Sequence, residues 1–236
     1  MNFFVTVLGS GSTLPTSKRK PTAQYVHCGN RHILIDCGEG TQAQMRSYGV
    51  KFQSIDHILI SHLHGDHYFG LVGLLSTMNL LGRVKPIAIY GPVRLQEIIE
   101  LQLNNDQSQL SFDVAFHVLN PKSSGLLFED KIIRLDNFPL SHRIPASGFL
   151  ITEKKKERKL NVRLAERDKV QIAYYKTLKK GQDVVGNDGK IISFEKYTEE
   201  APPARTYAFC SDTKYYEKII PYIEGVDLLY HEATYI

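Results

Sequence analysis

The 236-residue sequence predicts an α/β fold in which helices cover β-sheets. Short segments rich in β-branched residues, typical of strands, alternate with longer segments whose apolar residues recur at helical spacing. Two strands on either side of a Gly-Asn turn predict a hairpin at 24–38. Because no repeat, low-complexity segment or linker interrupts the chain, we expect one domain over residues 1–236.

Residue patterns predict these elements in order along the chain. Strands are expected at 2–9, 57–61 and 87–92, and helices at 41–50 with Thr41 as N-cap, at 68–82 and at 93–105. Strands then dominate, at 112–119, 126–130, 131–142, 147–152, 190–194 and 206–212. A helix is expected at 215–223 and a last strand within 226–236. Residues 153–183 are charged and weakly patterned, which indicates an excursion from the core.

Composition argues against several classes of protein. The chain has no run of about 18 apolar residues, the length that a membrane span needs. Its first residues lack the basic region and cleavage site of a signal peptide. Cys28, Cys37 and Cys210 are an odd number without a CxxC pair, which argues against a disulfide framework or a thiolate zinc site. We therefore expect a soluble, cytoplasmic protein with no membrane partner.

The formal net charge of +4 is concentrated in one segment. Residues 151–200 contain 13 Lys or Arg and 9 Asp or Glu, whereas the two signs balance in the rest of the chain. We therefore expect an anionic partner for this segment. The Gly-Ser repeats at 9–12 lack the GxxxxGK[ST] pattern of a phosphate loop, so we do not expect a nucleoside triphosphate site. We expect this loop to line the active site instead, with Arg19 facing phosphate.

Four predicted strands end in side chains that can bind a metal or transfer a proton. They lead into His62 and His64, into His142, into Asp212 and into His231. Loops at strand ends can converge while the sheet fixes their origins, so we expect one site. His142 and Asp212, judged by spacing alone, could equally be ordinary polar loop residues. Asp36, at the end of the predicted hairpin, either supports metal-binding histidines or forms a simple turn.

The segment SHLHGDH, residues 61–67, is the strongest single signal. Alternation along an extended backbone places His62 and His64 on one side, where they can share a cation. Asp66 and His67 then point toward a neighbouring metal position. A purely structural role explains this cluster poorly, because clustered imidazoles repel one another when charged. The pattern predicts half of a two-metal site, with metals about 3.5–4 Å apart that activate water for displacement at phosphorus. Asp212 suits the bridging carboxylate.

SHLHGDH is the hallmark motif of the metallo-β-lactamase fold, and the sequence resembles the ribonuclease Z branch of that fold. Six further segments carry the resemblance: LGSGSTLPTSKR at 8–19, LIDCGEGTQ at 34–42, PLSHRIPASGF at 139–149, LKKGQDV at 178–184, FCSDT at 209–213 and HEAT at 231–234. The resemblance covers nearly the whole chain. It implies a four-layer αββα sandwich and a zinc-dependent endonuclease that matures tRNA 3′ ends.

The resemblance also implies a role for each matching residue. His62, His64 and His142 would hold one Zn²⁺, Asp66 and His67 a second, and Asp212 would bridge the two. Mn²⁺ is a possible replacement for Zn²⁺. Asp66 would also act as general base on the attacking water, and His231 would protonate the leaving 3′ oxygen. The partners implied are precursor tRNA and a second copy of the chain in a homodimer.

The sequence departs from the family pattern in two places. The family continues beyond HEAT to a further metal-binding histidine, so we expect that the C-terminal part, with the seventh ligand, is missing from this chain. Bacterial members also carry a tRNA-binding arm with a Gly-Pro tip, which residues 168–181 lack. We still expect an inserted basic arm at 151–183, because phosphate contacts require cationic side chains. Its predicted RNA-binding residues are Lys154, Lys155, Lys156, Arg158 and Lys159.

Two other functions remain open at the level of sequence. One is a small-substrate phosphodiesterase or arylsulfatase of the same fold, which the basic segment disfavours. The other is a metal-poor RNA-binding chain, because the seventh ligand is absent.

Overall fold

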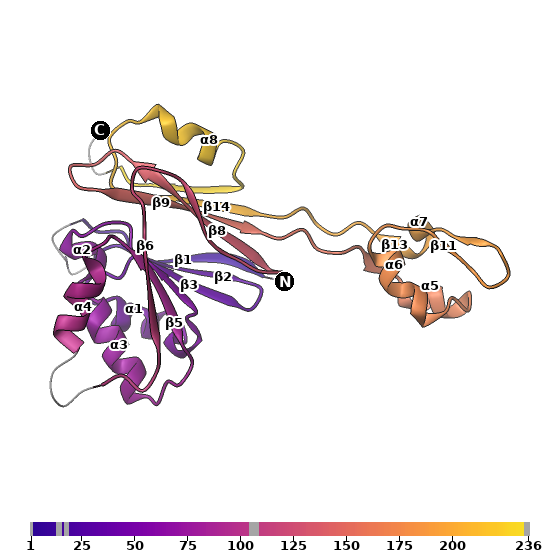
Figure 1. Cartoon of the computed structure of the whole chain (residues 1–236), viewed down its shortest axis with the longest axis horizontal. Helices are drawn as coiled ribbons and strands as arrows, with labels where there is room; N and C mark the ends of the chain where they lie inside the picture. The colour runs from indigo at the N-terminus through magenta and orange to yellow at the C-terminus, as the bar shows by residue number, and fades with distance from the viewer. Residues whose placement is uncertain (1, 13–15, 17–18, 104–108, 234–236) are drawn as a thin grey trace. The chain divides into compact units, whose positions relative to one another are not determined.

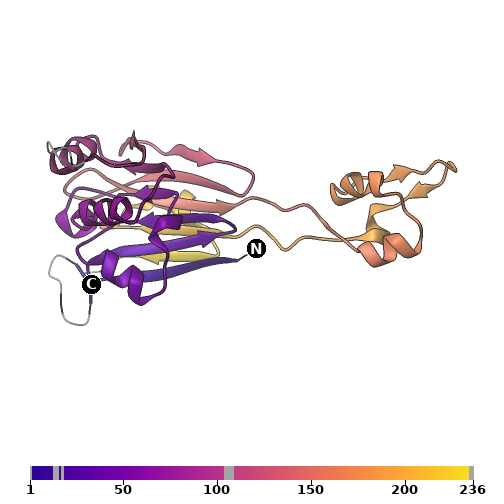
Figure 2. The ribbon, with the colours of Figure 1, turned by 90° about the horizontal axis from the view of Figure 1, so that it is seen from below.

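The computed structural model describes residues 2–12, 16, 19–103 and 109–233, which form two compact units (Figure 1). The first unit comprises Met1–Glu153 with Arg205–Ile236, and the second comprises Lys154–Ala204. In the first unit two sheets lie face to face, with helices outside both of them (Figures 1 and 2). This arrangement of mixed sheets covered by helices confirms the predicted fold class.

The first sheet has six strands in the order β1-β2-β3-β4-β5-β6. Their bounds are Phe3–Gly9, Ala23–Cys28, Arg31–Ile35, His57–Leu59, Ile87–Gly91 and Val114–Val118. The predicted hairpin is β2-β3, and its turn residue Gly29 adopts a φ of 64°, a conformation that glycine tolerates best. Strands β3 to β6 run parallel, so their carboxyl ends meet at one edge of the sheet.

Helices cover the outer face of the first sheet. They are α1 (Thr41–Ser47), η1 (Phe52–Ser54), α2 (Gly65–Tyr68), α3 (Leu71–Leu80) and α4 (Leu95–Leu103). Apolar side chains such as Leu34, Ile58 and Met45 are fully buried between this sheet and its helices. Thr41 was predicted as the N-cap of α1, and this is wrong: the cap is Gly40, and the Thr41 hydroxyl donates to the Gly38 carbonyl instead.

The second sheet has five strands in the order β15-β14-β9-β8-β7. Their bounds are Leu228–His231, Thr206–Cys210, Ala146–Glu153, Ile133–Leu140 and Gly125–Glu129. Phe149, Ile151 and Phe209 bury their side chains against the first sheet. Outside it lie η3 (Glu217–Ile219) and α8 (Ile220–Ile223). Two predicted elements lie partly outside the described residues: the helix 93–105 at residues 104–105, and the final strand 226–236 at residues 234–236.

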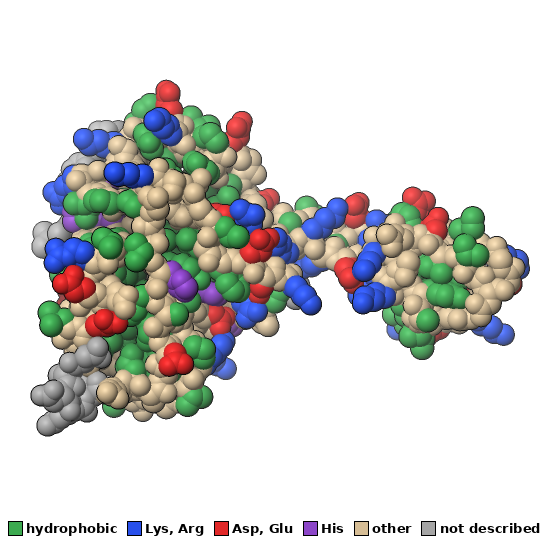
Figure 3. Space-filling model, viewed as in Figure 1, with side chains coloured by type: hydrophobic (Ala, Val, Ile, Leu, Met, Phe, Trp, Pro, Cys, Tyr) green, Lys and Arg blue, Asp and Glu red, His purple; other side chains and the backbone are tan. Residues whose placement is uncertain are grey.

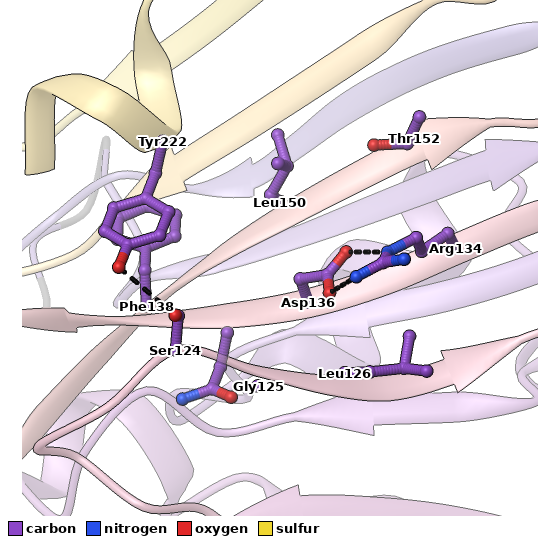
Figure 4. A pocket seen from close by; sticks show the side chains of 10 residues that line it. Ser124, Gly125, Leu126, Arg134, Asp136, Phe138, Leu150, Thr152 and Tyr222 are labelled. Atoms are coloured by element: carbon purple, nitrogen blue, oxygen red, sulfur yellow. Dashed lines mark hydrogen bonds and ion pairs between the residues drawn. The ribbon is translucent and has the colours of Figure 1, made fainter.

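A pocket of about 430 Å³ lies on the outer face of the second sheet, beside α8 (Figure 4). Arg134 donates two hydrogen bonds to Asp136 inside it, and the Tyr222 hydroxyl donates to Ser124. Among the described residues that line it there is no predicted metal ligand.

The second unit has its own small core of Ala165, Val170, Leu178 and Tyr197. Its elements are β10 (Lys159–Leu160), α5 (Val162–Arg167), η2 (Ile172–Tyr174), α6 (Tyr175–Lys179), β11 (Val184–Val185), β12 (Ile191–Ile192), α7 (Phe194–Tyr197) and β13 (Thr198–Glu199). β10 pairs with β13, which closes the unit. No helix among the described residues of either unit has the length and apolar character needed to cross a membrane.

Candidate metal centre

The loop that follows β4 and the short helix α2 carry four of the predicted site residues. The chain stays extended at His64, with φ −76° and ψ 142°, and turns into α2 at Gly65. His62 and His67 are buried, at 0% and 1% exposure, whereas His64 and Asp66 are partly exposed. The second sheet contributes the rest of the site, because His142 follows β8 and Asp212 follows β14.

Four side chains converge so that one donor atom of each lies within 4.8 Å of all the others: His62, His64, His142 and Asp212. Nδ1 of His64 lies 2.9 Å from Nε2 of His62 and 3.2 Å from Nε2 of His142. Oδ2 of Asp212 lies 3.8 Å from Nε2 of His62 and 3.7 Å from that of His142. Two ligands of a tetrahedral zinc ion stand about 3.3 Å apart, so this group has the spacing of a metal site.

A second group of donors shares Asp212 with the first. Nε2 of His67 lies 3.6 Å from Oδ2 of Asp66 and 3.5 Å from Oδ1 of Asp212. The two oxygens of Asp212 therefore face different groups, Oδ2 toward His62 and His142 and Oδ1 toward His67. A carboxylate placed in this way can bridge two cations.

Asp36 and Ser61 orient the histidines from behind. Oδ2 of Asp36 accepts hydrogen bonds from Nδ1 of His67 at 2.7 Å and from the Ser61 hydroxyl at 2.9 Å, while Oδ1 accepts from the Ser61 amide at 2.8 Å. The Ser61 hydroxyl also contacts Nδ1 of His62 at 3.0 Å and the Ser211 hydroxyl at 3.0 Å. With Nδ1 engaged on His62 and His67, Nε2 of each ring points into the site. The donor set thus fits a divalent metal, and Asp36 takes the supporting position rather than forming only a turn.

Burial and neighbouring charges shift the ionisation of these groups. Burial, with the nearby His67, lowers the pKa of His62 to about 2, so this ring stays neutral and keeps a lone pair for a ligand. Burial also lowers the pKa of His67, but the Asp36 carboxylate and Asp212 outweigh it and raise that pKa to about 10. Burial of Asp212 raises its pKa, yet hydrogen bonding and attraction to His67 bring it well below the usual range. Asp212 is therefore ionised.

The remaining predicted residues lie outside this cluster. His231 ends β15 in register with Cys210, two residues before Asp212, and its Nδ1 lies 2.6 Å from the Glu232 carbonyl oxygen. Arg19 is exposed in the loop that ends at Pro21, and residues 13–15 and 17–18 of that loop lie outside the described residues.

Arg19 belongs to the first unit, whereas the five other predicted RNA-binding residues belong to the second, whose surface carries Lys and Arg side chains (Figure 3). Lys155 and Lys159 are exposed, whereas Lys154, Lys156 and Arg158 are partly buried. Arg158 donates to the Thr198 hydroxyl at 2.7 Å and lies 4.9 Å from the centre of the Phe194 ring.

Sequence patterns missed three residues that contact the clustered histidines or line the cavity beside them. Ser61 lies inside the histidine motif, where its place directly before His62 was the available signal. Arg143 donates from Nε to Nε2 of His64 at 3.2 Å, and it directly follows the predicted ligand His142. Phe69 lines a cavity of about 240 Å³ next to His64 and Asp66. An exposed phenylalanine after a helix gives no signal in sequence alone.

Comparisons with known proteins identify relatives of this chain. Ribonuclease Z of Parabacteroides distasonis is 41% identical over 234 residues, which cover 99% of this chain and 77% of that protein. Ribonuclease Z of Porphyromonas gingivalis is 42% identical, with the same coverage. The family model for the anti-Pycsar protein Apyc1 matches residues 3–158.

Solved structures show the same fold. The crystal structure of human tRNase Z, short form, superimposes with a TM-score of 0.67 at 29% identity and covers 95% of this chain and 76% of that one. The metallo-β-lactamase fold protein YhfI from Bacillus subtilis gives a TM-score of 0.61 at 17% identity, with 95% of this chain and 68% of that one covered. The fold is therefore that of the metallo-β-lactamase superfamily.

Proposed function

This chain belongs to the ribonuclease Z family, and from this membership we propose that it is a metal-dependent endoribonuclease acting on precursor tRNA. Its residues 3–158 also match the family of the anti-Pycsar protein Apyc1. It would cut at the 3′ end of the tRNA, remove the trailer and leave a 3′-hydroxyl. The observation that carries the proposal is the position of Asp212, with one oxygen toward each of two donor groups.

The donor set supports two Zn²⁺ ions per complete protein, with Mn²⁺ as the alternative. His62, His64 and His142 would hold the first ion, Asp66 and His67 the second, and Asp212 both. When bound, such a metal pair activates a water molecule and stabilises the oxygens of a displacement at phosphorus.

Protons are handled by two residues of the chain. Asp66 accepts the proton of the attacking water, whose oxygen bonds to phosphorus as the bond from phosphorus to the 3′ oxygen breaks. His231 donates a proton to that departing oxygen, since its Nδ1 contacts the Glu232 carbonyl and its Nε2 is left for the transfer. The products are a tRNA with a 3′-hydroxyl and a trailer with a 5′-phosphate.

The second unit supports RNA, rather than a small phosphodiester, as the substrate. The ribonuclease Z relatives match over 234 residues and so include this unit, whereas the Apyc1 match ends at residue 158, close to where the unit begins. The expected arm at 151–183, most of which lies in this unit, contains Lys155 and Lys159, which are exposed and suited to phosphate contacts. We further propose a homodimer that acts in the cytoplasm, which suits an odd number of cysteines, all of them buried.

The decisive test is cleavage of a 3′-extended precursor tRNA, with the product ends mapped. The chain is assayed with Zn²⁺ or Mn²⁺, with chelator, and as Asp66→Ala, beside Asp113→Ala, which removes an exposed carboxylate before β6. We expect one cut near the discriminator base, lost with chelator and in Asp66→Ala but kept in Asp113→Ala.

Two other results would replace the proposal. Hydrolysis of bis(p-nitrophenyl) phosphate without cleavage of precursor tRNA would assign a small-substrate phosphodiesterase. Binding of tRNA without hydrolysis of either substrate, by a chain that retains less than one metal ion, would assign an RNA-binding protein.

A further inference from the structure

The cavity of about 240 Å³ beside the metal centre is lined by residues that the proposed chemistry does not use. Pro21, Glu39, Phe69 and Arg143 form its walls together with His64, Gly65 and Asp66. Since His64 and Asp66 both line the cavity and belong to the donor groups, the cavity adjoins the place where a phosphodiester would meet those groups.

Phe69 is an exposed aromatic side chain that is held in place. Its amide donates to the Gly65 carbonyl at 2.9 Å, and the Tyr68 ring lies 5.0 Å from its own in an edge-to-face arrangement. The Phe69 ring lies so close to Gly65 that a β-carbon there would stand 2.2 Å from the ring. Phe69 nevertheless remains 64% exposed. Gly65 therefore makes room for an aromatic surface that faces solvent beside the site.

Arg143 supplies a positive charge at the same cavity. Its Nε lies 3.2 Å from Nε2 of His64, whose Nδ1 faces His62 and His142. When Nδ1 of a neutral His64 serves as a metal ligand, the ring proton lies on Nε2, which then accepts no hydrogen bond from Arg143. The guanidinium donors of Arg143 are in that case available to an anionic group in the cavity.

We propose that this cavity binds the nucleotide next to the scissile phosphate, with its base stacked on Phe69 and a flanking phosphate held by Arg143. An apolar ring next to a cation is the arrangement that recognises single-stranded nucleic acid, because every base has an aromatic face and every linkage a negative charge. Stacking here would fix the strand and so position its phosphate at the donor groups. This inference rests on the proposed function, since it assumes that the substrate is RNA.

The test combines protein variants with abasic substrates. Three precursor tRNAs are compared: unmodified, abasic at the nucleotide 5′ of the scissile phosphate, and abasic at the nucleotide 3′ of it. The proteins are wild type, Phe69→Leu, Phe69→Tyr, Arg143→Gln and the control Tyr48→Leu, which alters an aromatic residue of similar exposure at the end of α1. Metal content is measured for each, and is expected to be unchanged.

We expect Phe69→Leu to lower kcat/KM on unmodified RNA by about 10-fold, within the range of one stacked base. Phe69→Tyr keeps an aromatic face and restores the rate, and Tyr48→Leu has no effect. One of the two abasic substrates is cut as slowly by wild type as by Phe69→Leu, because the stacking partner is already gone. Arg143→Gln weakens binding of all three RNAs equally, because a phosphate contact does not depend on the base.

Binding gives a readout that does not depend on catalysis. In the Asp66→Ala background, the affinity for the same RNAs is expected to fall when either Phe69 or the stacked base is removed, and to fall no further when both are. Three results would each overturn the inference. Phe69→Leu could keep full affinity and rate, its loss of affinity could add to the loss caused by each of the two abasic RNAs, or the variant could change its oligomeric state. Wild type that binds these RNAs without cutting them would refute the proposed function instead, and the binding data would still decide on Phe69.

Discussion

Nδ1 of His67 donates a 2.7 Å hydrogen bond to Oδ2 of Asp36, and both side chains are buried. The bond directs Nε2 of the same ring toward Asp66 and Asp212. Asp36 adopts a φ of 55°, which is uncommon for a residue other than glycine. Strain of this kind persists where the surroundings hold the residue, and here Ser61 and His67 do so.

We expect Asp36→Asn to lower metal affinity by about 10- to 100-fold, the usual cost of altering a residue that orients a metal-bound histidine. The amide keeps the shape of the carboxylate but loses the charge that favours the correct His67 proton position. Competition with a coloured chelator measures the affinity. Asp130→Asn is the control, because Asp130 is held just as firmly, by Arg31 at 2.7 Å, in the turn between β7 and β8. Equal affinity in both variants would contradict the supporting role.

Two glycines of the first unit should respond to alanine in opposite directions. A β-carbon on Gly38 would stand 2.2 Å from the Asp66 carbonyl oxygen, and backbone cannot move aside as a side-chain tip can. Gly38→Ala should therefore destabilise the fold by about 1–3 kcal/mol and displace Asp66.

Gly73, exposed in α3, has its nearest neighbouring atom 3.5 Å from a built β-carbon. Gly73→Ala should stabilise the fold by about 0.5–1 kcal/mol, because alanine loses less backbone entropy in a helix. Urea unfolding of the two variants with metal chelated measures both free energies. Destabilisation by Gly73→Ala of the size expected for Gly38→Ala would contradict this account.

Acid should weaken the fold through His57. Burial lowers the pKa of this imidazole to about 4, and it packs 4.4 Å from the Phe128 ring centre between the two sheets. The unfolded chain binds a proton near pH 6.5 while the folded chain does not, so stability is lost as the pH falls from about 7 toward 4.

Comparison with His57→Phe isolates this effect, because the variant keeps an aromatic ring but does not titrate. Between pH 7.5 and 5.5 the wild type should lose about 1 kcal/mol more unfolding free energy than the variant. Urea unfolding at both pH values measures the unfolding free energy of each protein. The contributions of the other histidines are the same in both proteins and cancel in the difference. Parallel losses in the two proteins would show that His57 is protonated in the folded state.

Exposed lysines of the second unit should govern how salt affects RNA binding. Replacing Lys155 and Lys159 by glutamine should reduce the slope of log affinity against log salt by about 1 to 2, because each phosphate contact releases a counterion. The rate of the bound complex should not change. Lys51→Gln with Lys122→Gln removes two exposed charges from the first unit as a control. A salt slope that changes equally in both double variants would mean that only net charge matters.

Local pattern predicted most of the strands and helices, because each carries its own hydrophobic period and turn residues. It also marked His62, His142 and Asp212 as residues that follow buried strands, and their side chains do converge. For His142 and Asp212, however, pattern alone left an ordinary loop role equally open. It could not show that the second unit reaches Ala204, because β10 pairs with β13 some 40 residues along the chain. Nor could it show that Gly65 packs against Phe69, a contact set by the turn into α2.

The donor groups come from both sheets of the first unit. His62, His64, Asp66 and His67 follow β4 of the first sheet, whereas His142 and Asp212 follow strands of the second. Neither half alone supplies the full set of donors. During synthesis the loop after β4 emerges first and Asp212 last, with the second unit between His142 and Asp212. The full donor set therefore exists only once both halves have been made and have docked, so a growing chain cannot complete this centre before β14 and Asp212 have been synthesised.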